Sequence, residues 1–281
     1  FPIAQALAMG ADIVVTGRVV DSATVLGTLI HEFGWKEDQY DLISAGTLAG
    51  HLLECGAQVT GGTFTDWEDV PNWTNIGFPI GECYADGSMV MTKAPDTGGL
   101  VSVGTVAEQM LYEVSDPQAY FVPDVTCDFS QVRFEQIGKD RVKVTGAIGY
   151  APTSTYKLCV TWSDGWRCST LTPIVGHNAQ AKAKRTATAL QERIDGLLRE
   201  TNMGPFKRKF SSLIGGEHSF GAQSRIAESR EIVLKMVVDH DDPAAVGLFA
   251  REHHSAASSM SPGTSINQAT NVFPLTRLSS F

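Results

Sequence analysis

Residues 10–22 read GADIVVTGRVVDS, and this stretch decides the expected fold class. The segment 11–17 is apolar and rich in β-branched residues, which is typical of a buried strand in a parallel sheet. Asp21 and Ser22 are good helix N-cap residues, and apolar side chains recur after them at helical spacing as far as Gly34. A strand that leads into a helix is half of a βαβ unit. The stretch therefore predicts an α/β protein with a partial parallel core.

The rest of the first part of the chain extends this core. The expected elements are, in order, a helix at 40–55, a hairpin with strands at 80–84 and 89–93, and a helix at 105–114. The last helix is predicted to begin with a capping box, in which Thr105 caps and Glu108 follows three residues later. We expect residues 1–130 to form one domain, the α/β core.

After residue 128 the pattern changes to hairpins, with turn signals such as Ser163-Asp164-Gly165. The expected elements are a strand at 156–162, a helix at 177–200, strands at 206–214 and 230–238, a helix at 243–258 and a last strand at 272–281. This β-α-β-β-α-β order is that of the ferredoxin-like fold, in which both helices cover one face of an antiparallel sheet. We expect residues 131–281 to form an α+β domain, a hairpin followed by a ferredoxin-like part.

The charge of the chain is divided between these two parts. The net charge is −9, but residues 1–130 carry 18 acidic and 3 basic side chains, whereas residues 131–281 carry 13 acidic and 19 basic ones. The acidic part would repel nucleic-acid phosphates, and the basic part lacks interleaved aromatic residues, so we expect no nucleic-acid partner. The predicted long helix carries several basic residues that form either a solvated face or a phosphate-binding face: Lys182, Lys184, Arg185 and Arg193.

The cysteine and histidine residues indicate the cell compartment and limit the metal chemistry that the sequence predicts. The five cysteines form no CxxC pair, which is typical of reduced thiols and predicts a cytoplasmic protein. The histidines have no metal-ligand spacing, so no metal site is expected, and the residues indicate no particular cofactor. No run of 18 apolar residues is present, so we expect no membrane partner.

The first candidate site lies where the predicted strand ends, at Gly17, Arg18 and Asp21. Ligands of open parallel sheets gather at the carboxyl ends of strands, next to the N–H groups of the following helix. The guanidinium of Arg18 would bind a carboxylate or phosphate, and Asp21 would hold that guanidinium or act as a base. In the alternative interpretation, Asp21 is only an N-cap and Arg18 its surface partner.

The second candidate site is a polar stripe of Thr47, His51 and Glu54 on the predicted helix 40–55. His51 is the side chain able to exchange a proton near neutral pH, and Glu54 would orient it. Glycines one turn apart on this helix, at positions 46 and 50, indicate close approach of another backbone or of a ligand. A structural histidine with satisfied hydrogen bonds is the alternative.

The third candidate site is the turn Thr60-Gly61-Gly62. Successive glycine and threonine N–H groups can form a nest that binds a phosphate or a developing oxyanion. By itself the motif favours an ordinary turn, and the proximity of His51 and Glu54 in the sequence adds weight to the nest.

Several of these stretches also carry a family resemblance. They are GADIVVTGRVVDSA at 10–23, AGTLAGHLLECGAQ at 45–58, TGG at 60–62, TVAEQ at 105–109, DPQAY at 116–120 and PDV at 123–125. With them the sequence resembles the AtuA-like proteins of the acyclic terpene utilisation family over nearly the whole chain. Members usually begin with an N-terminal α/β segment that carries a Gly-Phe-Trp-Gly-Asp type motif. The sequence lacks this segment, so we expect its core to be N-terminally incomplete.

The resemblance implies a role near the catabolism of citronellol, geraniol and related branched acids, whose intermediates are acyl-CoA thioesters. We therefore expect a small-molecule substrate, such as a CoA thioester or a carboxylate, and acid/base chemistry at the candidate residues. The alternative is a non-catalytic scaffold or assembly subunit of the pathway enzymes. Because sheets of ferredoxin-like domains commonly pair across a two-fold axis, we expect a homo-oligomer in either case.

Overall fold

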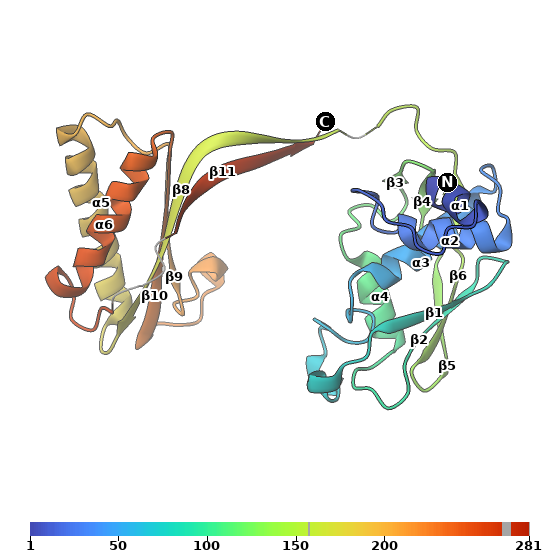
Figure 1. Cartoon of the computed structure of the whole chain (residues 1–281). Coiled ribbons are helices and arrows are strands. Elements are labelled where there is room, and N and C mark those ends of the chain that lie inside the picture. The colour runs from blue at the N-terminus through green and yellow to red at the C-terminus, as the bar shows by residue number, and fades with distance from the viewer. Residues whose placement is uncertain (157, 266–270, 281) are drawn as a thin grey trace. The chain divides into compact units, whose positions relative to one another are not determined.

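The structure is a computed structural model that describes residues 1–156, 158–265 and 271–280. The chain forms two compact units, residues 1–156 and 157–281, called unit 1 and unit 2 below (Figure 1). Both combine helices with antiparallel sheets, so the fold is α/β in the broad sense. Within the described residues, no helix has the length and apolar character needed to cross a bilayer.

Unit 1 contains four α-helices and two small sheets. The helices are α1 (Pro2–Ala8), α2 (Ala23–Phe33), α3 (Tyr40–Glu54) and α4 (Val103–Leu111), with 3₁₀ turns η1 (Trp67–Asp69) and η2 (Trp73–Asn75). One sheet has the strand order β1 (Pro79–Cys83), β2 (Met89–Lys93), β6 (Arg141–Thr145), β5 (Arg133–Gly138). The other has the order β3 (Tyr120–Val122), β4 (Val125–Asp128), β7 (Ile148–Tyr150). The helix predicted at 40–55 and the hairpin predicted at 80–93 are confirmed.

The hairpin strands after residue 130 belong to unit 1. β6 pairs with β2, and β7 pairs with β4, so strands 133–150 complete sheets that begin earlier in the chain. The boundary between the two units therefore lies later than the predicted boundary at residue 130.

Helix α3 lies at the centre of unit 1, where all of its residues 43–52 are buried. Two glycines permit this close packing. A Cβ atom on Gly46 would lie 2.7 Å from Cδ1 of Leu26, and one on Gly50 would lie 2.4 Å from the backbone oxygen of Ser22. These two glycines thus allow α3 to approach the beginning of α2, as the sequence predicted for a close contact with another backbone.

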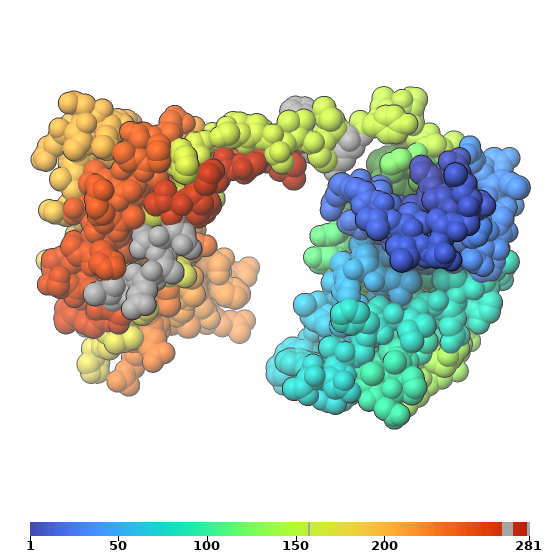
Figure 2. All heavy atoms as spheres, in the orientation of Figure 1, coloured from blue at the N-terminus to red at the C-terminus, as the bar shows by residue number. Residues whose placement is uncertain are grey.

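The parallel strand predicted at 11–17 is not formed. These residues have no ladder partner among the described residues, and Ile13 and Val15 are 82% and 90% exposed. The N-terminal segment, dark blue in Figure 2, lies at the surface of unit 1. A β-branched run forms a strand only where a neighbour accepts its backbone hydrogen bonds, and every ladder in the described part of the chain is antiparallel. A parallel core is therefore not confirmed.

The beginning of α4 also differs from the prediction. Ser102 is the N-cap, and its side chain accepts a hydrogen bond from the backbone N–H of Thr105. The Thr105 hydroxyl in turn accepts one from the backbone N–H of Ser102. Glu108 instead reaches the backbone N–H of Thr65. The capping box is therefore completed by the Thr105 hydroxyl, whereas the side chain that accepts from the N-cap N–H is usually glutamate or glutamine.

Unit 2 has the element order β-α-β-β-α-β along its described residues. Its elements are β8 (Cys159–Val175), α5 (Ala179–Glu200), β9 (Arg208–Ile214), η3 (His218–Gln223), β10 (Glu231–His240), α6 (Pro243–Ser259) and β11 (Asn271–Ser280). The strand order in the sheet is β11-β8-β10-β9, and all of its pairings are antiparallel. Both helices pack on one face of this sheet around one apolar core (Figure 1).

Strand β8 is much longer than the strand predicted at 156–162. The turn expected at Ser163-Asp164-Gly165 does not form, and the strand continues through it, paired with β11 and β10. The carboxylate of Asp164 forms ion pairs with Lys207, Arg208 and Arg277, and Gly165 adopts a left-handed φ of 92°. The sequence Ser163-Asp164-Gly165 is typical of a turn, and these ion pairs stabilise it as part of a strand.

Candidate functional site

A cavity of about 420 Å³ opens at the surface of unit 1. It is formed by the extended segment before α2, the first turn of α2, the end of α3 and the segment after α4. Its lining residues are Gly17, Arg18, Val19, Asp21, Thr24, Glu54, Cys55 and Glu113. Four residues predicted from the first two candidate sites are thus brought together: Gly17, Arg18, Asp21 and Glu54.

The close packing of α2 and α3 produces this arrangement. Gly50 lies against Ser22, the residue that precedes α2, and Glu54 follows Gly50 by one helical turn. Residues one turn apart lie on the same face of a helix. The side chain of Glu54 therefore reaches the cavity that Asp21 borders.

Charges of both signs meet at the cavity. Arg18 and Asp21 form a loose pair, with Nη1 and Oδ1 3.7 Å apart and side chains 90% and 52% exposed. Such an exposed pair contributes little to stability, so the guanidinium is available to a ligand. Glu54 and Glu113 add two further carboxylates to the lining.

Glu54 is the titratable group whose proton affinity the cavity changes most. Burial raises the pKa of Glu54 to about 7, and the negative charges of Asp21 and Glu113 act in the same direction. A carboxyl group with this pKa holds a proton for about half of the time at neutral pH, as general acid/base catalysis requires.

His51 lies behind Glu54, away from the cavity. Its Nδ1 is 3.1 Å from Oε1 of Glu54, and the His51 side chain is 2% exposed. The alignment of these atoms does not meet hydrogen-bond geometry. Within the described residues neither ring nitrogen makes a hydrogen bond of full geometry, but backbone groups of Gln109, Met110 and Tyr112 lie near the ring and favour its protonated form. Burial lowers the pKa of His51, so the ring is neutral at pH 7. The side chain of Gln109 donates a 2.9 Å hydrogen bond to the His51 backbone oxygen and helps to fix this turn of α3.

Cys55 borders the cavity next to Glu54. Its Sγ lies 3.9 Å from Oε1 of Glu54, and burial raises the pKa of the Cys55 thiol. The thiol is therefore protonated at neutral pH. Because the thiolate is the nucleophilic form, the geometry does not favour Cys55 as a nucleophile.

The other predicted residues lie outside this cavity. Thr47 is buried in α3, where its hydroxyl donates a 2.8 Å hydrogen bond to the backbone oxygen of Ile43. In the turn Thr60-Gly61-Gly62, all three N–H groups donate to the backbone oxygens of Ala57 or Gln58. The hydroxyl of Thr60 lies within hydrogen-bond distance of two backbone oxygens, that of Gly77 at 2.5 Å and that of Ala57 at 2.9 Å. These bonds occupy the N–H groups that an anion nest would use.

Sequence reasoning missed Glu113. It follows α4 and has a left-handed φ of 60°, an uncommon conformation for a residue with a side chain. Such strain is maintained where the surrounding structure requires it, and it is enriched at functional sites. The segment Tyr112-Glu113-Val114 has no motif, so only the tertiary fold brings this carboxylate to Glu54.

The described residues contain no group of three or more histidine, cysteine, aspartate or glutamate side chains arranged to hold a metal ion. The groups at the cavity that can exchange a proton or bind an anion are Glu54, with its neighbour His51, and the cation Arg18.

Comparisons with known proteins identify a family. No curated protein and no solved structure matches the chain. One family model, described as "Acyclic terpene utilisation family protein AtuA", matches residues 1–279, which is nearly the whole chain. The resemblance found in the glycine-rich stretches is thereby confirmed, and the chain belongs to the acyclic terpene utilisation family of AtuA proteins.

Proposed function

We propose that the cavity of unit 1 is an acid/base site that acts on a branched acyl-CoA thioester or a related carboxylate. Family membership supports a role in acyclic terpene utilisation. The observation that carries the proposal is a buried carboxyl group, Glu54, with a pKa of about 7 at the wall of a cavity that also presents Arg18.

In this proposal, Glu54 exchanges the proton and His51 positions it. The sequence suggested the reverse roles, but Glu54 borders the cavity whereas His51 is buried behind it. A neutral imidazole near the second side of the carboxyl group limits its rotation and excludes water from that side. His51 thus acts through Glu54, and Asp21 acts by raising the proton affinity of Glu54.

The reaction class that fits these groups is proton abstraction next to a thioester carbonyl. The carboxylate of Glu54 would take the proton from the α-carbon, the electron pair of the C–H bond would form the carbon–carbon double bond of an enolate, and the π pair of the carbonyl would move to its oxygen. The guanidinium of Arg18 would stabilise the negative charge on that oxygen or bind a carboxylate elsewhere on the substrate. The return of a proton from Glu54 to carbon completes the exchange.

Hydrogen exchange in D₂O tests this proposal without knowledge of the final product. The full chain is incubated with citronellyl-CoA, whose α-carbon is saturated and carries the protons that form an enolate, and deuterium in the recovered thioester is measured by mass spectrometry. We expect incorporation that rises with pH around 7, and a loss of about 100-fold or more in Glu54→Gln. Glu37→Gln, a change of the same kind at an exposed position, is the control. No incorporation by the unmodified protein, or equal incorporation by Glu54→Gln, would contradict the proposal.

A second proposal concerns unit 2, whose order β-α-β-β-α-β and sheet order β11-β8-β10-β9 support a ferredoxin-like fold. The helices cover one face of the sheet, and the opposite face exposes Phe210, Ile214 and Leu171. An exposed apolar face of this kind favours self-association with a second copy, and it also supports the assembly-subunit alternative. In sedimentation velocity we expect a dimer or larger species that Phe210→Asp dissociates. A monomeric unmodified protein would contradict this.

A further inference from the structure

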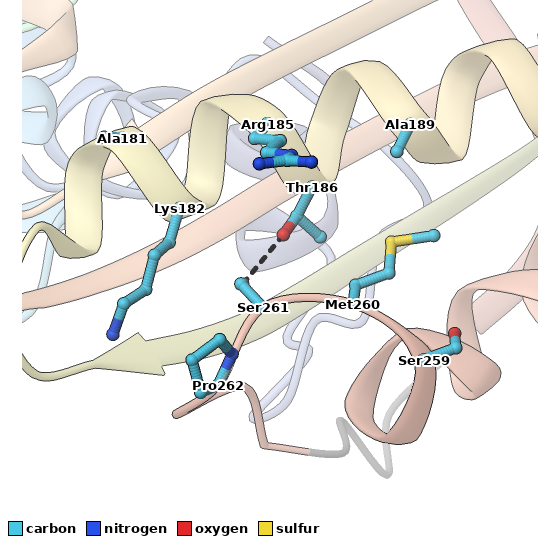
Figure 3. A pocket seen from close by; sticks show the side chains of 9 residues that line it. All are labelled: Ala181, Lys182, Arg185, Thr186, Ala189, Ser259, Met260, Ser261 and Pro262. Atoms are coloured by element: carbon cyan, nitrogen blue, oxygen red, sulfur yellow. Dashed lines mark hydrogen bonds between the residues drawn. The ribbon is translucent and has the colours of Figure 1, made fainter.

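A second cavity, of about 600 Å³, lies in unit 2 and takes no part in the proposed acid/base site. It is formed by one face of α5 and by the segment that follows α6 (Figure 3). Its lining residues are Ala181, Lys182, Arg185, Thr186, Ala189, Ser259, Met260, Ser261 and Pro262.

The lining is cationic, with Lys182 and Arg185 and no carboxylate. The two segments that form the cavity are also free of acidic residues in the sequence, since none occurs at 176–191 or at 253–281. Both features favour an anionic ligand.

Another basic residue on the same helix has an acidic partner, whereas the two cations of the cavity have none in the described part of the chain. Arg193, two turns further along α5, is paired with Glu252 at 2.5 Å. Arg185 has no carboxylate within 4 Å among the described residues. Lys182 donates one hydrogen bond, 3.1 Å long, to the backbone oxygen of Val175. That bond holds the ammonium group in place and leaves two of its three protons for a ligand.

The opposite wall is held rigid by hydroxyl groups and backbone contacts. Thr186 Oγ1 lies 2.9 Å from Ser261 Oγ (Figure 3). Ser261 Oγ in turn lies 3.0 Å from Thr264 Oγ1. Gly263 has a left-handed φ of 85°, and its backbone oxygen accepts a 3.0 Å hydrogen bond from the N–H of Val175. The loop is therefore anchored to the end of β8 and presents hydroxyl groups beside the two cations.

We propose that this cavity binds a small organic phosphate. The ammonium of Lys182 and the guanidinium of Arg185 would contact the phosphate oxygens. The volume exceeds that of a phosphate group alone, and Ala189 and Met260 provide apolar wall for the organic part. Of the two interpretations of the basic helix, the geometry favours the phosphate-binding face over the solvated face.

Titration calorimetry of the full chain tests this site with phenyl phosphate, inorganic phosphate and benzoate at one fixed ionic strength. We expect phenyl phosphate to bind more tightly than either inorganic phosphate or benzoate, because it offers both the phosphate and an apolar group. Arg185→Gln and Lys182→Gln should each weaken its binding about tenfold or more. The matched control is Lys184→Gln, an equal change of charge on the same helix at an exposed position outside the cavity lining. It should leave the affinity nearly unchanged.

A second variant fills the cavity without any change of charge. Ala189→Trp should abolish the binding of phenyl phosphate, and thermal unfolding of each variant verifies that it is folded. The inference is overturned if the unmodified protein does not bind phenyl phosphate, if Lys184→Gln weakens binding as much as Arg185→Gln, or if folded Ala189→Trp binds normally. None of these outcomes bears on hydrogen exchange at Glu54, so the two proposals can fail separately.

Discussion

The two units each contain a buried histidine on a helix, and the surroundings of the two rings differ. His253 in unit 2 lies between the hydroxyl groups of Thr170 and Thr172, which contact its two ring nitrogens. The ring of His51 in unit 1 makes no side-chain hydrogen bond of full geometry among the described residues, and Nδ1 faces the carboxyl group of Glu54. Burial lowers the pKa of both rings. Burial alone therefore does not mark a functional histidine, whereas a raised carboxyl pKa beside it, at a cavity wall, does.

The comparison predicts that acid destabilises unit 2 through His253, and this is the largest expected effect. Burial lowers the pKa of His253 to about 4, from 6.5 in an exposed histidine. Between these pH values the unfolded chain binds the proton and the folded unit does not, so stability is complete above pH 6.5 and is lost as the pH falls toward 4. The loss amounts to about 3 kcal/mol. Urea unfolding from pH 7 to pH 4, followed by hydrogen exchange in peptides of β8 and α6, measures it.

A matched pair of variants tests whether the effect belongs to the buried ring. His253→Gln can still hydrogen-bond to the two threonines but does not titrate, so most of the pH dependence between 6.5 and 4 should disappear. His254→Gln changes an exposed neighbour on the same helix and should leave most of it in place. Ion pairs lower the pKa of Asp239 and Asp164 below 3.8, so the stability they contribute is lost at more acidic pH. If both histidine variants retained the full pH dependence, the assignment to His253 would be wrong.

The elements that the sequence predicted well are those whose signals are local. α6 begins as predicted with proline at its first position, and α3 and α5 follow apolar helical periodicity that packing does not override. The two clear failures, the segment 11–17 and the turn at 163–165, depend on distant residues. No pattern in 11–17 reveals whether a neighbouring strand exists. Likewise, nothing near Asp164 reveals that Lys207, Arg208 and Arg277 pair with it.

The candidate site was only half visible in the sequence for the same reason. Glu54 and His51 were found because they are one turn apart on a helix whose glycines indicated a close contact. Which of them faces a cavity depends on where α2 packs against α3, and this is a tertiary property. Glu113 comes from a third segment and carries no motif. The charge of α5 could be read from the sequence, but the absence of a carboxylate near Arg185 within the described part of the chain could not.

A smaller effect of opposite sign is expected in unit 1 from Glu54. Burial raises the pKa of Glu54 to about 7, well above the 4.5 of an exposed glutamate. The folded unit therefore binds more protons than the unfolded chain between these values, and the stability that Glu54 contributes, complete below pH 4.5, is lost as the pH rises to 7. Glu54→Gln should stabilise unit 1 at pH 8 by about 2 kcal/mol, less than the His253 effect because water in the cavity screens the carboxylate.

Urea unfolding at pH 8 and at pH 4.5, with hydrogen exchange in peptides of α3 as the readout, measures this difference. Glu54→Gln should gain stability at pH 8 and change little at pH 4.5, where the carboxyl group is already protonated in the folded unit. Glu37→Gln, at an exposed position, should be neutral at both pH values. An equal shift at both pH values would mean that Glu54 acts through packing and not through its proton. In that case the raised pKa of Glu54 would no longer distinguish the surroundings of His51 from those of His253.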